Sequence, residues 1–408
     1  MATKIDQRPL VALIGGPDVD ARIPLVEELK GRFRFVVHGS DPLKADRFAQ
    51  RGIAFRPYPL SRRVAPIADL RTVMALRASF QSERPDVVHA FDTKPCVFAA
   101  LAARAAGVPV VTSTITGLGS LYSSNSAKTR IVRMVYERMQ RMACRRSDLT
   151  VFQNHDDERQ MLATGIAQRG KTMVVLGSGV DTNAFDPQCF TKADRNRVRT
   201  ELGIAEDAIV VTMVSRMTRT KGALEFAAIA RECAQLGAPT RFLAVGGEDR
   251  DSIDCLTREE LASLRAATTW TGARDDVAAI LAASDVFVLP SVCREGIPRS
   301  LLEAAAMGLP LVTTDSPGCN EACSNGQNGL VAKIGDLPSL SHAVSLLIGD
   351  PELRARYGAA SRKLARERFD LRVIADQLAS AWTRLLDAKR SRHSAATAAK
   401  PASNILSR

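Results

Sequence analysis

The sequence predicts an α/β fold of two doubly wound parallel sheets that face each other across a cleft. Short apolar runs alternate with helical patterns along the chain, which is typical of parallel sheets covered by helices on both faces. The alternation pauses in a polar stretch at residues 177–194 and then starts again. The 408 residues are also too many for a single core, so two domains are expected.

The first half of the chain holds the first run of this alternation. Its opening strand ends in Gly15-Gly16-Pro17, and a helix follows. Strands are expected at residues 10–14, 33–38, 53–58, 86–90, 108–113, 148–152 and 172–176. Helices are expected at residues 22–31, 43–51, 66–82, 96–106, 127–144 and 156–163.

The second half repeats the pattern. Strands are expected at residues 208–214, 241–245, 268–271, 285–289, 311–313 and 329–331, and helices at 223–236, 258–265, 277–282, 298–307, 337–348 and 351–368. A last helix at 371–386 is expected to pack back on the first domain. The predicted division is therefore a domain at 1–190, a second at 191–369, a crossing helix at 370–388 and a disordered basic tail at 389–408. Ligands of such sheets bind beyond the carboxyl ends of the strands, so the cleft is the expected site.

Composition narrows the classes of partner and compartment. The net charge of +12 indicates an anionic partner: nucleic acid, a phosphorylated ligand or an anionic membrane surface. Aromatic residues make up only 5% of the chain, without a basic aromatic motif for stacking bases, so nucleic acid is disfavoured. The sequence has neither a membrane-spanning apolar run nor an apolar signal region at its start. The eight cysteines form no paired ladder with histidine, so we expect reduced thiols, no metal site and a cytoplasmic protein.

Two acids lie where the strand at 285–289 leads through a tight loop into a helix. Glu295 falls in the loop at the helix N-terminus and Glu303 on the helix. The free N–H groups of a helix N-terminus attract anions, and a carboxylate there competes with them. A ligand with both a phosphate and several hydroxyls would explain this placement. Its phosphate would bind the N–H groups, and its hydroxyls would donate hydrogen bonds to the carboxylates. A nucleotide-sugar is such a ligand. The alternative is that Glu295 is a first-turn acid and Glu303 a solvated helix residue.

Two cations follow the first strand of the second half. Arg216 and Lys221 lie between the end of that strand and the next helix. Such a pair suits a diphosphate, because a guanidinium binds it as a fork and an ammonium as a point charge. The alternative is that both side chains solvate an exposed loop.

Further motifs accompany these four residues. They are Gly177-Ser178-Gly179-Val180-Asp181, Ser215-Arg216, Lys221-Gly222, Gly246-Gly247, Gly272-Ala273-Arg274-Asp275-Asp276-Val277, Pro290-Ser291 and Gly308-Leu309-Pro310-Leu311-Val312. With Glu295 and Glu303 separated by seven residues, this set resembles the family 4 retaining glycosyltransferases, which have the GT-B fold. Neither Gly15-Gly16 nor Gly246-Gly247 completes a dinucleotide fingerprint, so a nicotinamide enzyme is disfavoured.

The first half of the chain resembles this family less closely than the second half does. Its matching residues are Gly15-Gly16, Arg22-Ile23-Pro24-Leu25, Asp92-Thr93-Lys94-Pro95, Thr114-Ile115-Thr116-Gly117-Leu118-Gly119 and Phe152-Gln153-Asn154. They resemble a subgroup that builds capsule, O-antigen and lipid-linked oligosaccharide intermediates on polyprenyl carriers.

The resemblance implies a role for each matching residue. Arg216 and Lys221 would neutralise the donor diphosphate without a metal or a cofactor, and Glu303 would bind the ribose. Glu295 and the N–H groups of Gly296 and Ile297 would hold the transferred sugar and a phosphate. Gly246 and Arg274 complete the implied donor side, and the implied acceptor side is Gly15, Gly16, Arg22, Lys94, Thr116 and Gly117. Many family members have a histidine where this chain has Thr116, and His89 is not at the matching position, so acceptor activation has no assigned residue.

The segment 128–146 reads as a basic amphipathic helix. Ile131, Met134, Val135, Met139 and Met142 recur at helical spacing among arginines. The stripe either packs into the core, with the arginines solvated, or lies on an anionic membrane close to a polyprenyl-linked acceptor.

The resulting hypothesis is a metal-independent retaining hexosyl- or N-acetylhexosaminyltransferase of polysaccharide biosynthesis. It would use a nucleotide diphosphate-sugar, with UDP favoured, and a polyprenyl-diphosphate-linked saccharide. The expected location is the cytoplasm, with peripheral contact at the inner face of the cytoplasmic membrane as the alternative to a fully soluble protein. A nucleotide-sugar epimerase of the same architecture and a non-catalytic component of an assembly complex are the alternatives. The identity of the sugar, the acceptor and the linkage depends on a few pocket contacts that the sequence does not specify.

Overall fold

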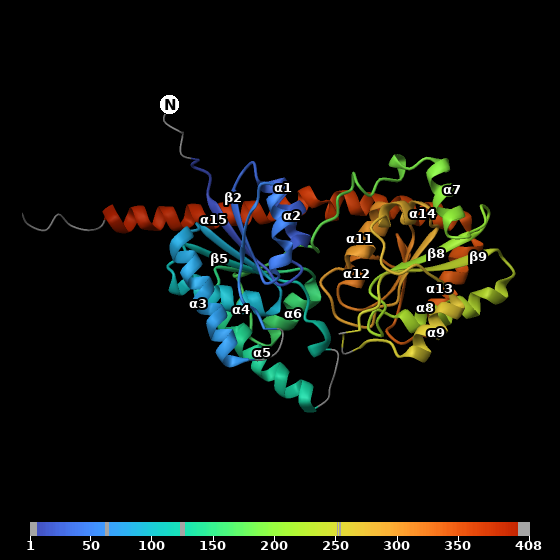
Figure 1. The fold of residues 1–408 in the computed structure, drawn as a ribbon, viewed down its shortest axis with the longest axis horizontal. Coiled ribbons are helices and arrows are strands. Elements are labelled where there is room, and N and C mark those ends of the chain that lie inside the picture. The colour runs from blue at the N-terminus through green and yellow to red at the C-terminus, as the bar shows by residue number, and fades with distance from the viewer. Residues whose placement is uncertain (1–5, 62–64, 123–126, 251, 253, 399–408) are drawn as a thin grey trace, which may run out of the picture.

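The first domain is built on a seven-stranded parallel sheet (Figure 1). The computed structural model describes residues 6–61, 65–122, 127–250, 252 and 254–398. The strand order is β3-β2-β1-β4-β5-β6-β7. The strands are β1 (Leu10–Ile14), β2 (Arg34–Gly39), β3 (Ala54–Pro57), β4 (Val87–Phe91), β5 (Val110–Ile115), β6 (Leu149–Phe152) and β7 (Thr172–Val174).

Both faces of this sheet are covered, as its largely apolar strands predict. Val11 and Leu13 of β1 face one core, which also contains side chains of α1, α2 and the last helix, α15. Ala12 and Ile14 face the opposite core, under α3 and α4. The helices are α1 (Ile23–Leu29), α2 (Ala45–Ala49), α3 (Pro66–Glu83), α4 (Thr93–Ala105), α5 (Ala127–Arg146) and α6 (His155–Ala163).

The second domain has a six-stranded parallel sheet with the order β10-β9-β8-β11-β12-β13. Its strands are β8 (Ile209–Val214), β9 (Thr240–Val245), β10 (Thr269–Trp270), β11 (Val286–Leu289), β12 (Leu311–Thr314) and β13 (Gly329–Ala332). Its helices are α7 (Lys192–Glu201), α8 (Ala223–Cys233), α9 (Arg258–Ala267), α10 (Val277–Ala282), α11 (Arg299–Ala306), α12 (Cys319–Ala322), α13 (Leu337–Gly349) and α14 (Pro351–Leu364). The predicted α/β fold with two Rossmann-like parallel sheets is therefore confirmed.

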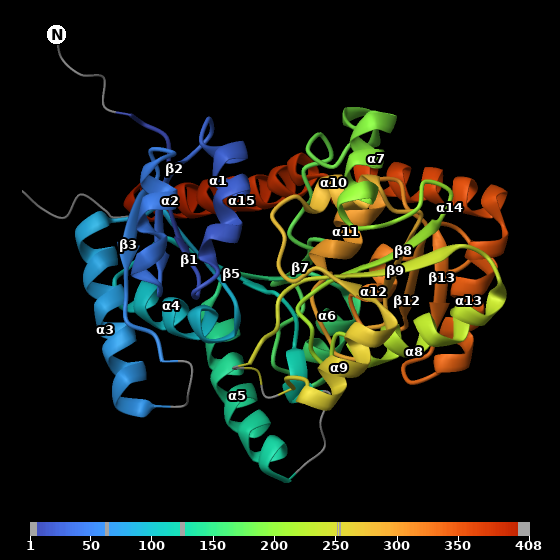
Figure 2. The same ribbon diagram turned by 45° about the vertical axis from the view of Figure 1, so that its right-hand side comes forward.

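The C-terminal helix α15 (Leu371–Ala398) crosses from the second domain back to the first (Figure 2). Trp382 is 1% exposed and packs edge-on against Phe33, with ring centroids 5.5 Å apart. The helix also continues through residues 389–398, where a disordered tail was predicted. That prediction is wrong for this segment, because it is rich in alanine, a strong helix former, and Lys389 pairs with Asp148 at 2.9 Å. The rest of the predicted tail lies outside the described residues.

Contacts between the domains gather at the carboxyl ends of the strands. The backbone N–H of Gly119 donates to the carbonyl oxygen of Arg294 at 3.1 Å. The guanidinium of Arg294 pairs with Asp157 at 3.0 Å. The fold therefore fixes the loop that follows β11 against the first domain. Within the part of the chain that the structure describes, no helix is both long and apolar enough to cross a bilayer.

Candidate active site

The Glu295 carboxylate forms the centre of the candidate site. It lies in the loop between β11 and α11, where one of its oxygens pairs with the ammonium of Lys221. The hydroxyl of Ser291 and the thiol of Cys293 donate to the other oxygen at 3.1 and 3.2 Å. Burial raises the pKa of Glu295, but Lys221 and the two hydrogen bonds outweigh it, so the pKa lies below the ordinary glutamate value. The carboxylate is therefore held charged although its side chain is only 20% exposed.

The backbone of this loop is set by close approaches that only glycine permits. Gly117 of the first domain has φ +129°, and a β-carbon there would lie 2.6 Å from the backbone nitrogen of Gly296. A β-carbon on Gly296 would in turn lie 2.6 Å from the carbonyl oxygen of Thr116. The side-chain amide of Asn154 donates to the carbonyl oxygen of Glu295 at 2.8 Å. Residues of both domains thus fix the position of the Glu295 carboxylate.

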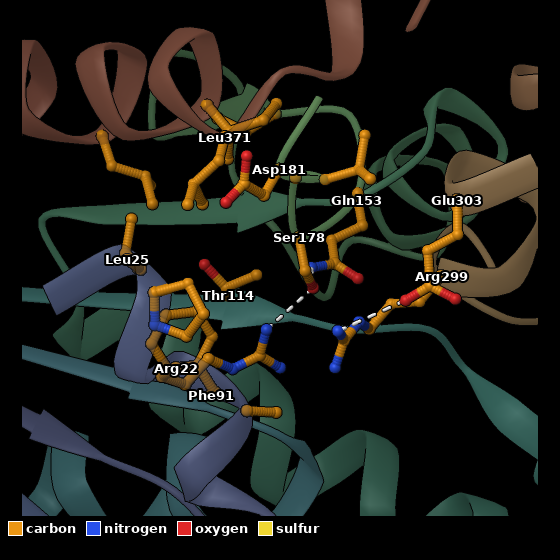
Figure 3. Close-up of a pocket in the computed structure, with 18 of the residues that line it drawn as sticks. Arg22, Leu25, Phe91, Thr114, Gln153, Ser178, Asp181, Arg299, Glu303 and Leu371 are labelled. Carbon is orange, nitrogen blue, oxygen red and sulfur yellow. Dashed lines mark hydrogen bonds and ion pairs between the residues drawn. The ribbon is translucent and has the colours of Figure 1, made fainter. Parts of the chain in front are cut away.

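Glu303 lies on α11 and faces a cavity of about 210 Å³ between the domains (Figure 3). Its carboxylate pairs with Arg299 at 3.4 Å. Burial raises the pKa of Glu303, and the Arg299 charge only partly opposes the shift. Across the cavity, Arg22 of the first domain donates to the hydroxyl of Ser178 at 2.7 Å and lies 4.3 Å over the ring of Phe91. The cavity thus combines cations from both domains with two acids, Glu303 and Asp181.

The other predicted donor-side cations have different partners. Arg216 pairs with Asp249, and its side chain is 65% exposed. Arg274 pairs with Asp276 and with Glu201, each at 2.7 Å. Neither guanidinium contacts Glu295 or Glu303 in any described interaction. Of the four residues on which the sequence argument rested, the structure therefore brings only Lys221 and Glu295 into direct contact.

Gly246, also predicted on the donor side, lies in the turn after β9. A β-carbon there would lie 1.7 Å from the carbonyl oxygen of Ser215. The glycine therefore lets this turn pack against the start of the Arg216 loop.

The predicted acceptor-side residues do not gather at one point: Arg22 lines the cavity, Gly117 packs against Gly296, and the others have separate partners. The carboxylate of Asp92 accepts hydrogen bonds from the backbone N–H of Gly16 at 3.3 Å and from the hydroxyl of Thr116 at 3.2 Å. The carbonyl oxygen of Gly15 accepts from the hydroxyl of Tyr58 at 2.8 Å. Lys94 instead pairs with Asp69 of α3 at 2.8 Å.

His89 is a buried core residue. Its ring nitrogens contact the hydroxyls of Thr112 and Thr114 at 2.8 and 2.9 Å. Burial lowers its pKa to about 3, so the ring is neutral at physiological pH. This environment agrees with the sequence argument, which assigned His89 no catalytic role.

Several residues of the site were not selected from the sequence for a role. Ser291 and Cys293 bind the Glu295 carboxylate, and Asp92 binds the acceptor-side loops. Ser291 could have been found, because Pro290-Ser291 belongs to the motif that carried the resemblance. Nothing in the sequence marks the Asp92 backbone as unusual. Among the described residues, no group of three His, Cys, Asp or Glu side chains is placed to hold a metal ion.

Comparisons with known proteins agree with this architecture. Residues 194–364 match the family model for glycosyl transferases group 1, and residues 24–177 match that for a glycosyl transferase 4-like domain. N,N'-diacetylbacillosaminyl-diphospho-undecaprenol alpha-1,3-N-acetylgalactosaminyltransferase of Campylobacter jejuni is 29% identical over 90% of this chain and 95% of that protein. UDP-Gal:alpha-D-GlcNAc-diphosphoundecaprenol alpha-1,3-galactosyltransferase of Escherichia coli is 29% identical over 74% of this chain and 76% of that protein.

A solved structure shows the same fold. The Anabaena protein HepE, crystallised with UDP and glucose, superimposes with a TM-score of 0.75 at 19% identity, over 92% of this chain and 100% of that one. The two parallel sheets, the buried acid after β11 and the two family matches lead to one conclusion. The chain belongs to the group 1, or family 4, glycosyltransferases of the GT-B fold.

Proposed function

We propose that this glycosyltransferase moves a sugar from a UDP-sugar to a saccharide carried on polyprenyl diphosphate. The half-buried ion pair between Lys221 and Glu295 carries the donor part of the proposal. It places an ammonium and a carboxylate at the start of α11, where free N–H groups attract a phosphate. The names of the Campylobacter and Escherichia relatives support the polyprenyl-linked acceptor, since both describe sugars on undecaprenyl diphosphate.

The proposed mechanism is retaining and independent of a metal ion. As the glycosidic bond breaks, its electron pair passes to the diphosphate, and Lys221 and Arg216 stabilise the developing charge. Arg216 must exchange Asp249 for the phosphate to do so, which its exposed position allows. The acceptor hydroxyl attacks the anomeric carbon from the same face, and its proton passes to the departing phosphate oxygen. Glu295 holds hydroxyls of the sugar during this exchange.

A panel of nucleotide-sugars, incubated with a membrane extract, tests the proposed function. Transfer to a lipid-linked saccharide, scored by mass spectrometry, is the expected result with a UDP-sugar. An epimerase would instead convert the UDP-sugar without any acceptor. A non-catalytic assembly component predicts that Lys221→Ala and Glu295→Ala variants still support glycan synthesis in cells, whereas we expect both to abolish it.

We further propose that the first domain binds the anionic inner face of the cytoplasmic membrane. The stripe predicted on α5 divides in two: Met139 packs against the core, while Ile131, Met134 and Val135 are 65, 69 and 46% exposed. The side chain of Lys128, at the start of the predicted basic segment, lies outside the described residues. Exposed apolar side chains near a bilayer partition into it, and surrounding arginines attract its phosphates.

Helix α3 extends the same surface. Ile67, Leu70 and Met74 are 74, 61 and 62% exposed. In both views of the ribbon the N-terminal ends of α3 and α5 reach the same edge of the first domain (Figures 1 and 2). Both helices thus carry exposed apolar side chains, and such side chains with arginines on the same helices suit an anionic bilayer. A membrane-bound acceptor would then meet the cleft without leaving its lipid.

Liposome flotation tests the membrane contact. The wild type should bind vesicles that contain phosphatidylglycerol, and it should dissociate from them at high salt. Two double variants, Ile131→Ser with Met134→Ser and Arg130→Glu with Arg138→Glu, should each weaken binding at least tenfold. The control is Leu346→Ser on α13, whose side chain is 41% exposed on the other domain. Unchanged binding by both double variants would reject this surface.

A further inference from the structure

Asp92 has a backbone conformation that aspartate rarely adopts. It follows β4 and precedes α4, with φ +69° and ψ 170°. This region of backbone space is occupied almost only by glycine, because the β-carbon of other residues is crowded there. Among the described residues, the other non-glycine with positive φ is Arg84, which ends α3 in the ordinary left-handed conformation. The strain at Asp92 must be maintained by the surrounding structure.

The strained backbone directs the Asp92 carboxylate toward the acceptor side of the cleft. Asp92 precedes the first residue of α4, but its side chain does not cap that helix. It accepts instead from Gly16 and Thr116, which lie at the ends of β1 and β5. The side chain remains half-buried. One carboxylate therefore joins three loops that the sequence placed on the acceptor side.

The charged groups around Asp92 leave its carboxylate available to a ligand. Burial lowers the pKa of the Arg22 guanidinium, and the negative charge of Asp92 is the main influence that opposes this shift. Arg22 makes its hydrogen bond to Ser178 rather than to Asp92. The described interactions include no ion pair of Asp92 with a lysine or arginine. A half-buried carboxylate with neutral donors on one side can accept a further hydrogen bond from a hydroxyl on the other.

Asp92 is also connected to the Glu295 loop through its hydrogen-bond partner Thr116. Its partner Thr116 precedes Gly117, and the backbones of Gly117 and Gly296 approach too closely for any side chain between them. Gly296 follows Glu295 directly. A short chain of contacts therefore links the two carboxylates: Asp92 binds Thr116, and the backbone of Thr116 and Gly117 packs against Gly296, next to Glu295.

We propose that Asp92 orients the attacking hydroxyl of the acceptor saccharide by accepting its hydrogen bond. This assignment depends on the proposed function. It gives the acceptor side a polar group for the attacking hydroxyl, which the sequence did not provide because Thr116 stands where many family members have a histidine. The oxygen of the held hydroxyl forms the new bond to the anomeric carbon as the bond from that carbon to the donor phosphate breaks. The proton of that hydroxyl passes from the hydroxyl oxygen to the departing phosphate oxygen, and Asp92 remains a carboxylate throughout the step. Asp92 acts by positioning the hydroxyl. Displacing a reacting group by about 1 Å costs on the order of 100-fold in rate.

Two variants test this assignment. Asp92→Asn keeps the size of the side chain and removes its charge, and Asp92→Gly removes the carboxylate while suiting the backbone conformation. Both should lower kcat for transfer about 100-fold, whereas the Kd for UDP and the rate of UDP-sugar hydrolysis without acceptor stay within about twofold of the wild type. Asp46→Asn, at an exposed acid of α2, is the control and should change none of these quantities.

Three other outcomes would contradict the role of Asp92, and they differ in whether the proposed function survives. If the wild type transfers sugar and either Asp92→Gly or Asp92→Asn keeps its kcat, the role of Asp92 is overturned and the proposed function stays intact. A parallel loss of UDP affinity, hydrolysis and Tm in both variants means that Asp92 only supports the fold, which also overturns it. A wild type that transfers no sugar to any polyprenyl-linked saccharide overturns the proposed function, and the Asp92 assignment with it.

Discussion

Replacing Lys221 by methionine should invert the pH dependence that Glu295 gives to stability. In the wild type the pKa of Glu295 lies below the ordinary value of 4.5, because Lys221 outweighs burial. The unfolded chain then binds more protons, so this residue stabilises the fold above pH 4.5 and the contribution is lost as pH falls. Without Lys221, burial remains and the pKa rises. The folded chain then binds more protons, and stability falls as pH rises.

The size of this effect follows from the burial of the pair. The side chains of Lys221 and Glu295 are 16 and 20% exposed, and removing one partner of a buried pair costs about 3–5 kcal/mol. Ser291 and Cys293 still donate to Glu295, so we expect about 3 kcal/mol at pH 7. Urea denaturation between pH 4.5 and 7.5 measures the effect.

The matched variant for this measurement is the double substitution Lys221→Met with Glu295→Gln. It removes the buried charge and should recover most of the lost stability with a flat pH profile. If Lys221→Met alone kept the rising profile of the wild type, the proposed balance of charges around Glu295 would be refuted.

Three further predictions concern single positions. Gly117→Ala should lower Tm by several degrees and abolish transfer, because its β-carbon would meet Gly296. Gly119→Ala is the matched variant: its φ of +62° also disfavours a side chain, but a β-carbon there meets no atom within 4 Å. It should therefore lower Tm less and keep transfer, as thermal unfolding and a transfer assay measure. Glu303→Gln should raise Tm at pH 7, since burial raises the pKa of this acid, yet weaken UDP binding about tenfold by calorimetry if the carboxylate binds ribose. Trp382→Ala should cost about 3–5 kcal/mol in urea denaturation, and a loss below 1 kcal/mol would mean that α15 does not anchor to the first domain.

Most of the fold could be predicted because its strands are short, largely apolar runs that alternate with helical patterns. Each strand of both sheets lies within a residue or two of the range expected from the sequence. Helix α7 was missed, since its residues 192–201 carry too few apolar side chains to show a helical period. Its N-terminal signal was nevertheless present, because Thr191 and Asp194 form a capping box. A charged helix is recognised from its caps rather than from its hydrophobic pattern.

The candidate site was less predictable than the fold. Local sequence indicated that Glu295 lies at a helix start, and the structure pairs it with Lys221. The partners of Arg216 and Arg274 could not be foreseen, since Asp249 and Glu201 reach them only through the tertiary fold. The donor roles inferred for these arginines remain predictions.

The tight contact between the domains explains why both halves of the chain are needed for one site. Glu295 belongs to the second domain, but Asn154 binds its carbonyl oxygen and Gly117 presses on its backbone. A carboxylate positioned to within a few tenths of an ångström requires a backbone that cannot shift, and glycine contacts supply this because they leave no side chain that could rotate. Any opening of the cleft must therefore break these contacts and release the Glu295 loop. With the donor bound at Glu295 as proposed, donor binding and the approach of the first domain would be coupled through the same few atoms.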